Sequence, residues 1–216
     1  MKITPQPSEL RWTRRKQARP GEILDAALSV FAQKGFAAAR MDDIARQAGV
    51  TKGTLYIYFE NKEAMFKALV RKAVGTTLAS VAADVQTYEG SARFLLRLVL
   101  TRLSRLIAQG EQAVLAKVII AESGNFPWLA EFYRGEVVET GLSLLTALVE
   151  RGIAQGEFRP LPAAHVARLC VAPALLSAIW QVTFSHLDPV PYDDKNLTDA
   201  HLDILFRGLA AEGAAR

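Results

Sequence analysis

A short run of side chains around residue 55 has the composition expected of a surface that contacts another molecule. Successive residues of a helix are rotated by about 100°, so Leu55 and Phe59 lie on one face of a helix that follows Thr51. The opposite arc and its flanks carry Lys52, Gly53, Thr54, Tyr56, Ile57 and Tyr58. Ammonium and hydroxyl groups donate hydrogen bonds to phosphate oxygens, and a lysine also donates to guanine O6 and N7. The pattern therefore predicts a surface that contacts DNA.

Two members of this set, Gly53 and Ile57, lack a hydrogen-bonding side chain. Gly53 allows the backbone to come close to the sugar-phosphate. Ile57 points away from the apolar face of its own helix, and we interpret it as packing against a thymine methyl or a deoxyribose. Arg40, just upstream, is placed to reach a phosphate, although the sequence is equally consistent with a solvated surface arginine.

A second short helix is predicted immediately before the first. Apolar residues recur at the i, i+3, i+4 and i+7 spacing of one helix face: Met41, Ile44, Ala45 and Ala48. Gly49 can take the left-handed conformation that ends a helix, and Thr51 is a favourable N-cap for the next one. Two short helices joined by such a turn form a helix-turn-helix, whose second helix enters the major groove.

Longer helices are predicted on both sides of this motif. Pro20 opens the upstream helix and Gly35 ends it. Residues 1–19 show no helical period and carry a basic run, which predicts a flexible basic arm that is either simply solvated or folds onto DNA. Downstream, Asn61 caps a helix that runs from Lys62 to about residue 87.

Residues 41–66, Met-Asp-Asp-Ile-Ala-Arg-Gln-Ala-Gly-Val-Thr-Lys-Gly-Thr-Leu-Tyr-Ile-Tyr-Phe-Glu-Asn-Lys-Glu-Ala-Met-Phe, resemble the DNA-binding signature of TetR-family transcriptional regulators. The run Gly-Thr-Leu-Tyr-x-Tyr-Phe followed by Asn-Lys-Glu is far more specific than a general helix-turn-helix pattern. With the preceding helix, the resemblance covers about the first third of the chain. It implies an all-α homodimer with a three-helix DNA-binding head and a C-terminal body that binds a small molecule and dimerises. By position, it implies groove contacts from Thr51 and Lys52 and phosphate contacts from Thr54, Tyr56, Tyr58 and Lys62.

The distribution of charge agrees with a head that meets a polyanion. The chain has 216 residues and a net charge of +4. Residues 1–72 hold fourteen Lys and Arg against seven Asp and Glu, a net charge of +7, whereas residues 73–216 hold twelve against fifteen, a net charge of −3. A basic segment followed by a mildly acidic one is expected where only the first contacts nucleic acid.

Composition also favours a cytoplasmic protein. One cysteine, Cys170, excludes an intrachain disulfide and suits a reducing compartment. The N-terminus shows no apolar signal segment, and the most apolar run, residues 169–184, is interrupted by Gln181. We interpret that run as a helix buried on most sides, and we expect no membrane contact.

Residues 71–216 show helical spacing throughout, which predicts an antiparallel helical bundle that binds a ligand and dimerises, behind a helix-turn-helix domain at residues 20–70. The segment 163–186 is apolar nearly all round and needs cover on more than one side. A second copy that pairs the last two long helices into a four-helix bundle would supply it. The predicted dimer contacts are Leu169, Leu176, Leu202, Leu205, Phe206 and Leu209.

A ligand pocket in this body is predicted from aromatic residues interspersed with polar ones. The candidates are Phe94, Glu122, Phe126, Trp128, Tyr133, Ser177, Trp180, Gln181 and Phe184. Aromatic residues at helical spacing are also ordinary core residues, so each candidate has this second interpretation. A buried amide must find a partner, which favours Gln181.

The leading interpretation is a ligand-responsive transcriptional repressor that binds a palindromic operator as a dimer and is released by a small molecule. The alternative is a constitutive dimeric DNA-binding protein without an inducer. An enzyme has little support, because the sequence has no glycine-rich phosphate loop and no nucleophile elbow. The three histidines are too scattered to predict a metal site, and we expect no cofactor.

Overall fold

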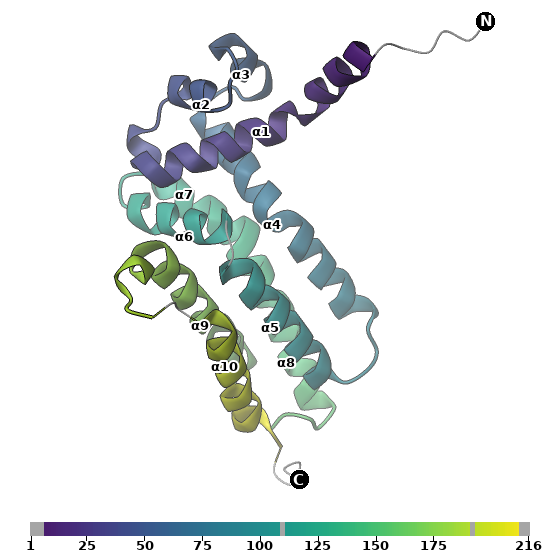
Figure 1. Cartoon of the computed structure of the whole chain (residues 1–216). Helices are drawn as coiled ribbons and strands as arrows, with labels where there is room; N and C mark the ends of the chain where they lie inside the picture. The colour runs from purple at the N-terminus through teal and green to yellow at the C-terminus, as the bar shows by residue number, and fades with distance from the viewer. Residues whose placement is uncertain (1–6, 109–110, 191–192, 212–216) are drawn as a thin grey trace, which may run out of the picture. The chain divides into compact units, whose positions relative to one another are not determined.

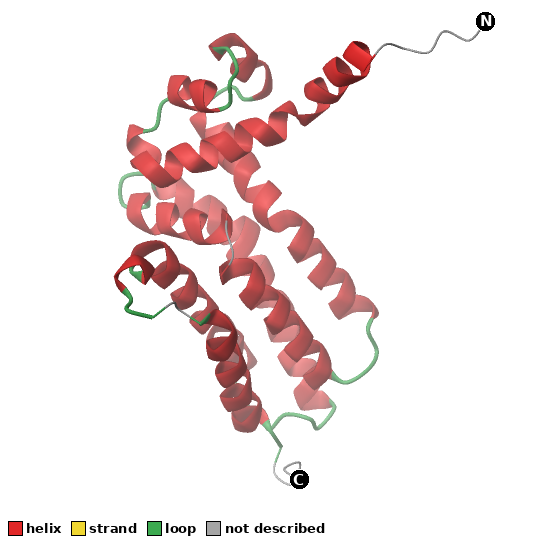
Figure 2. Ribbon diagram, in the orientation of Figure 1, coloured by secondary structure: helices red, strands yellow, loops and turns green. Residues whose placement is uncertain are grey.

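The computed structural model describes residues 7–108, 111–190 and 193–211. All regular structure in these residues is helical, apart from one isolated bridge between Phe158 and Ala210 (Figure 2). The all-α prediction is therefore confirmed. The chain separates into two compact units, Met1–Val70 and Arg71–Arg216, and the division falls inside a helix.

The first unit contains α1 (Pro7–Ala38), α2 (Met41–Gln47), α3 (Lys52–Tyr58) and the beginning of α4 (Lys62–Thr87) (Figure 1). The first helix starts earlier than the sequence predicted, since the backbone of residues 7–19 is helical and Pro20 lies inside α1. A proline inside a helix removes one backbone donor and crowds the carbonyl four residues earlier, but the segment before Pro20 is rich in Arg, Lys, Gln and Ala, which favour helix.

Three phenylalanine rings form the centre of this unit. Phe31, Phe36 and Phe66 lie with their ring centroids 5.4 to 6.0 Å apart. Gly35 has a φ of 75°, which interrupts the helical geometry of α1 and allows Phe36 to turn back onto Phe31. All three rings are buried, so the cluster joins the end of α1 to the beginning of α4.

The second unit contains the rest of α4 and a bundle of further helices (Figure 1). These are α5 (Ala92–Ala108), α6 (Glu111–Glu122), α7 (Pro127–Tyr133), α8 (Thr140–Ala154), α9 (Ala163–Thr183) and α10 (Asp194–Leu209). A π-helical segment, η1 (Arg134–Glu139), joins α7 to α8, and a 3-10 turn, η2 (Ser185–Leu187), follows α9. The core includes Leu95, Val99, Leu148, Phe158 and Phe206, which bring α5, α8 and α10 together.

The π-helical segment contains Gly135, near which the sequence indicated a bend. Single π turns inside helices are uncommon and often mark functional sites.

Helix α9 packs against α5, α6, α8 and α10, although its length and hydropathy alone would allow it to span a membrane. Its outward side exposes Leu169 (61%) and Leu176 (59%). On α10, Ile204 is 72% exposed, although the sequence did not single it out. These three side chains leave an apolar strip on the surface of one subunit.

The predicted dimer contacts on α10 need correction. Leu202, Phe206 and Leu209 are buried inside the subunit, and Leu205 is half-buried against the same core. The first three share a face at i, i+4 and i+7, and that face covers α5 and α9. A side chain that fills the core of its own subunit cannot also supply an interface.

Candidate nucleic-acid interface and apolar cavity

The turn between α2 and α3 has the predicted geometry. Gly49 has a φ of 64°, and Thr51 lies in an extended conformation at the start of α3. The Thr51 hydroxyl accepts a hydrogen bond from the backbone N–H of Thr54 at 3.2 Å. The hydroxyls of Thr51 and Thr54 are also 2.9 Å apart, so both threonines stabilise the first turn of α3.

The side of α3 that was predicted to face DNA is open to solvent. Ile57 is 79% exposed and Tyr56 is 46% exposed, while Leu55 and Phe59 are buried on the opposite side. Thr51, Lys52, Gly53 and Arg40 are also exposed, and Thr54 and Tyr58 are half-buried. A single exposed aliphatic side chain is common on protein surfaces, but Ile57 lies among lysine and hydroxyl groups on the side that was predicted to contact DNA.

Lys52 is held by an acidic residue of the preceding helix. Its ammonium lies 2.9 Å from the Asp42 carboxylate, and that hydrogen bond, with the attraction between the charges, raises the pKa of Lys52. Both side chains are more than half exposed, and exposed ion pairs contribute little to stability. The ammonium can therefore exchange this carboxylate for a phosphate oxygen or a base edge.

Lys62, which was expected to contact phosphate, has a different position. Its ammonium donates to the backbone carbonyls of Phe36, Ala37 (3.1 Å) and Ala39 (3.0 Å), and lies 4.4 Å from the centroid of the Phe36 ring. These carbonyls belong to the end of α1 and the residue after it. A cation is favourable there because the last carbonyls of a helix have no partner within the helix. In this arrangement Lys62 stabilises the head.

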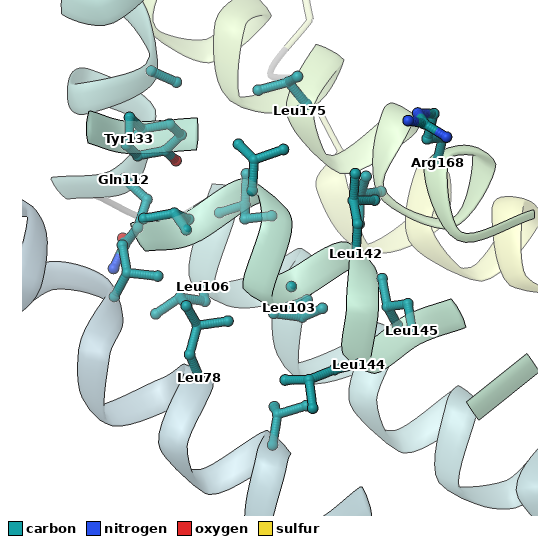
Figure 3. Close-up of a pocket in the computed structure, with 18 residues that line it drawn as sticks. Leu78, Leu103, Leu106, Gln112, Tyr133, Leu142, Leu144, Leu145, Arg168 and Leu175 are labelled. Atoms are coloured by element: carbon teal, nitrogen blue, oxygen red, sulfur yellow. The ribbon is translucent and has the colours of Figure 1, made fainter. Parts of the chain in front are cut away.

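The second unit encloses an apolar cavity of about 370 Å³. Helices α4 to α9 and the segment η1 all contribute to its wall (Figure 3). The lining is mainly aliphatic: Val74, Leu78, Val81, Leu103, Leu106, Ile107, Ala116, Val137, Val138, Gly141, Leu142, Leu144, Leu145, Val171 and Leu175, with Gln112, Tyr133 and Arg168 as the polar members. A volume of this size falls within the range of small-molecule pockets.

Of the nine pocket residues predicted from the sequence, Tyr133 lines this cavity and the others do not. Phe94 is exposed and stacks beside Tyr88, and Phe184 stacks on Trp180. The Trp180 indole donates to Asp188 at 2.7 Å. Glu122 and Ser177 are buried away from the cavity, and Phe126, Trp128 and Gln181 also lie outside its wall.

The polar members of the wall differ in their surroundings. Gln112 donates its amide to the carbonyl of Ala73 at 2.6 Å. Burial raises the pKa of Tyr133, whose hydroxyl is aimed toward the cavity in Figure 3. Arg168 is exposed at the edge and donates to the carbonyl of Ala164 at 3.3 Å. A ligand here meets an almost wholly apolar wall with few groups that fix its orientation.

Comparison with known proteins agrees with this geometry. Residues 23–69 match the family described as bacterial regulatory proteins, tetR family, and residues 87–189 match the tetracyclin repressor-like C-terminal domain. The chain is 31% identical over 164 residues to the HTH-type transcriptional regulator YfiR of Bacillus subtilis, covering 71% of this chain and 75% of that protein. This chain belongs to the TetR family.

Other TetR-family relatives cover nearly the whole chain. The fatty acid metabolism regulator protein of Bacillus subtilis is 26% identical over 196 residues, 90% of this chain and 98% of that protein. The structure of FadR from Bacillus subtilis in complex with stearoyl-CoA superposes with a TM-score of 0.70 at 25% identity, covering 87% and 98% of the two chains. The ketosteroid regulator KstR2 of Mycobacterium tuberculosis shares the fold, with a TM-score of 0.67 at 23% identity, covering 89% and 95%.

The single cysteine of this TetR-family chain is unsuited to redox sensing. Cys170 is buried, and burial raises the pKa of its thiol to about 12. The thiol therefore stays protonated at neutral pH, whereas reactive cysteines depend on the thiolate. Within the residues that the structure describes, no three His, Cys, Asp or Glu side chains are grouped to hold a metal ion.

We predict that Lys62→Met lowers the free energy of unfolding by about 1.5 to 3 kcal/mol, the usual value of hydrogen bonds to a charged group. Urea unfolding of the full-length protein, followed by circular dichroism, measures the change. Lys34→Met is the matched control, because the half-exposed Lys34 pairs with one carboxylate, that of Asp43 at 2.8 Å, and the loss of one such pair at the surface should cost about 1 kcal/mol or less. Unchanged stability of Lys62→Met together with weaker DNA binding would instead support a phosphate contact.

Proposed function

We propose that this TetR-family regulator is a repressor that binds a palindromic operator as a homodimer and leaves it when a small molecule with an apolar chain occupies the cavity. The observation that carries the DNA-binding part is the exposure of Ile57 among lysine and hydroxyl groups on one side of α3. The same side of a second helix in a helix-turn-helix enters the major groove. The basic first third of the chain supports this assignment.

The proposed contacts divide into two kinds. Lys52 and Ile57 meet base edges, and Gly53 allows close approach of the backbone. The remaining exposed or half-buried donors fix the register on phosphate oxygens: Arg40, Thr51, Thr54, Tyr56 and Tyr58. We assign Lys62 to positioning, because its ammonium is already bound to the carbonyls at the end of α1.

We propose that the dimer forms through the apolar strip of α9 and α10. Leu169, Leu176 and Ile204 are all more than half exposed in one subunit, and burying them against a second copy would remove that cost. Such a dimer carries two copies of α3. Two such helices read half-sites separated by about 34 Å, one turn of DNA.

The effector is proposed to bind in the apolar cavity. The aliphatic wall favours a long apolar chain, and the relative FadR was crystallised with stearoyl-CoA. Binding releases DNA only if the effector prefers one arrangement of the dimer over the other, however tightly it binds. Helix α4 lines the cavity and also contributes residues to the DNA-binding unit. We therefore propose that α4 couples effector binding to DNA binding. We expect the protein to act in the cytoplasm without a cofactor.

For the DNA surface, we predict that sites selected from a random pool by the purified protein have two-fold symmetry. Ile57→Ala should then relax the preference at one base step in each half-site, with a loss of about 1 to 3 kcal/mol of discrimination. Sequencing of the pools selected by the two proteins checks this. An equal loss of affinity on all sequences would contradict a thymine contact, and a site without symmetry would contradict the dimer.

For the dimer, we predict that Leu176→Glu converts the protein to a monomer, because it places two charges inside an apolar interface. Sedimentation equilibrium measures the mass. Glu replacing the equally exposed Ile120 of α6 is the control and should leave a dimer. A dimer that persists in Leu176→Glu would place the interface elsewhere.

For the effector, we predict that dodecanoyl-CoA weakens operator binding and that Ala116→Phe removes this response, because the added ring fills part of the cavity. Fluorescence anisotropy of labelled operator DNA reports release. Ala83→Phe is the matched control, since Ala83 is exposed on α4 and does not line the cavity. If no fatty acid or thioester that is tested changes the affinity for the operator, the alternative of a constitutive DNA-binding protein without an inducer would be favoured.

A further inference from the structure

An open, shallow groove that includes several polar side chains lies next to the apolar cavity, on α4 and α5. The groove is lined by Thr76, Thr77 and Ser80 of α4 and by Arg102 and Arg105 of α5, together with Val81 and Leu106. Val81 and Leu106 also line the cavity, so the two hollows share a wall. Helices α4 and α5 lie beside each other, joined by an ion pair between Arg102 and Asp84 (Figure 1).

Five of the seven residues that line the groove carry side-chain hydrogen-bond donors. Arg102 is paired with Asp84 at 2.5 Å, whereas Arg105 is exposed and has no carboxylate within 4 Å among the described residues. The hydroxyls of Thr76, Thr77 and Ser80 form no hydrogen bond with any described group. Two arginines and three hydroxyl-bearing residues line one hollow. Asp84 pairs with Arg102, and Arg105 lies close enough to Lys195 of α10 for their positive charges to repel each other.

We propose that this groove binds the phosphorylated head of an amphipathic effector whose apolar chain occupies the cavity. The inference rests on the proposed function, because it assumes that the cavity is the effector site. A guanidinium matches phosphate oxygens with two parallel N–H donors, and hydroxyls add further hydrogen bonds. The cavity alone has an aliphatic wall that cannot compensate a multiply charged group, so the head must remain in a polar, hydrated place at its edge.

The other cationic group at the cavity, Arg168, fits this role less well. Figure 3 shows Arg168 and Leu106 on opposite sides of the cavity, so the Arg168 edge is separate from the groove. Arg168 offers one guanidinium, which already donates to the carbonyl of Ala164. The groove offers two guanidinium groups with hydroxyls from an adjacent helix. A head with several phosphate oxygens gains more contacts in the groove.

In this groove the phosphorylated group of the effector would contact α4. Three of its donors, Thr76, Thr77 and Ser80, belong to the helix that also reaches into the DNA-binding unit. A phosphate that bridges them to Arg105 would pull α4 and α5 together on one side of the cavity. The phosphorylated group of the effector would then favour one arrangement of the dimer over the other, while its apolar chain provides affinity.

Binding of matched C12 probes to the full-length protein tests the assignment. The probes are dodecanol, dodecyl phosphate and dodecanoyl-CoA, since about a dozen methylene groups, each roughly as large as a water molecule of about 30 Å³, fill the cavity. Isothermal titration calorimetry gives the Kd of each probe. We expect dodecyl phosphate or dodecanoyl-CoA to bind at least about tenfold more tightly than dodecanol, with a Kd that rises with salt.

Two arginine variants locate the head. Arg105→Gln should weaken the phosphorylated probes about tenfold and change dodecanol less than twofold, whereas Arg168→Gln should spare all three. If the three probes bind with equal Kd values that do not change in Arg105→Gln, the groove assignment is wrong, whereas the proposed effector cavity still stands. Weaker binding of the phosphorylated probes in Arg168→Gln alone also overturns the groove assignment, and it places the phosphorylated group of the effector at α9. If no probe binds, or if Ala116→Phe leaves binding unchanged, the proposed effector cavity fails and the groove assignment fails with it.

Discussion

The burial of Leu55 and Phe59 determines which side of α3 can meet another molecule. The helix has only seven residues, so it cannot be stable alone and depends on this apolar contact with the rest of the first unit. Once these two side chains are buried, the helix period leaves Lys52, Tyr56 and Ile57 on the outside. The Thr51 cap then fixes where the helix starts, and with it the register of the exposed side.

The same constraint explains the role of Lys62. A three-ring cluster at the end of α1 needs Gly35 to leave helical geometry, and this leaves the carbonyls near Phe36 without partners in the helix. The ammonium of Lys62 satisfies them from the first residue of α4. The residue therefore joins the two long helices of the head, which is a different use of a positive charge from contacting DNA.

How well each feature can be predicted from the sequence depends on how far apart along the chain its interacting residues lie. The cap at Thr51, the turn at Gly49 and the exposed side of α3 depend on neighbours within a few residues, and the sequence predicts them well. The side of α10 that is buried depends on packing against α5 and α9, so Leu202, Phe206 and Leu209 were assigned to the wrong surface. A ligand pocket was predicted in this unit, but apart from Tyr133 the residues of its wall were missed, for a related reason. Its wall consists of the same aliphatic residues as a core, and only the arrangement of helices in space leaves the gap between them.

Three polar contacts hold the part of α4 that begins the second unit. Arg71 pairs with Glu136 at 2.6 Å, Lys72 with Glu111 at 3.5 Å, and Gln112 donates to the carbonyl of Ala73 at 2.6 Å. The partners belong to η1 and α6, and both of these segments contribute to the cavity wall. The guanidinium of Arg71 lowers the pKa of Glu136, so this pair stays charged at neutral pH.

Two of these three contacts are exposed ion pairs, which individually contribute little to stability. A ligand that moves η1 or α6 therefore faces a small cost in shifting this part of α4. By contrast, the buried apolar contacts of Phe66, Leu69 and Val70 earlier in α4 resist bending of the helix. Under the proposed function, a ligand in the cavity would therefore change these two ion pairs at less cost than the buried contacts of Phe66, Leu69 and Val70.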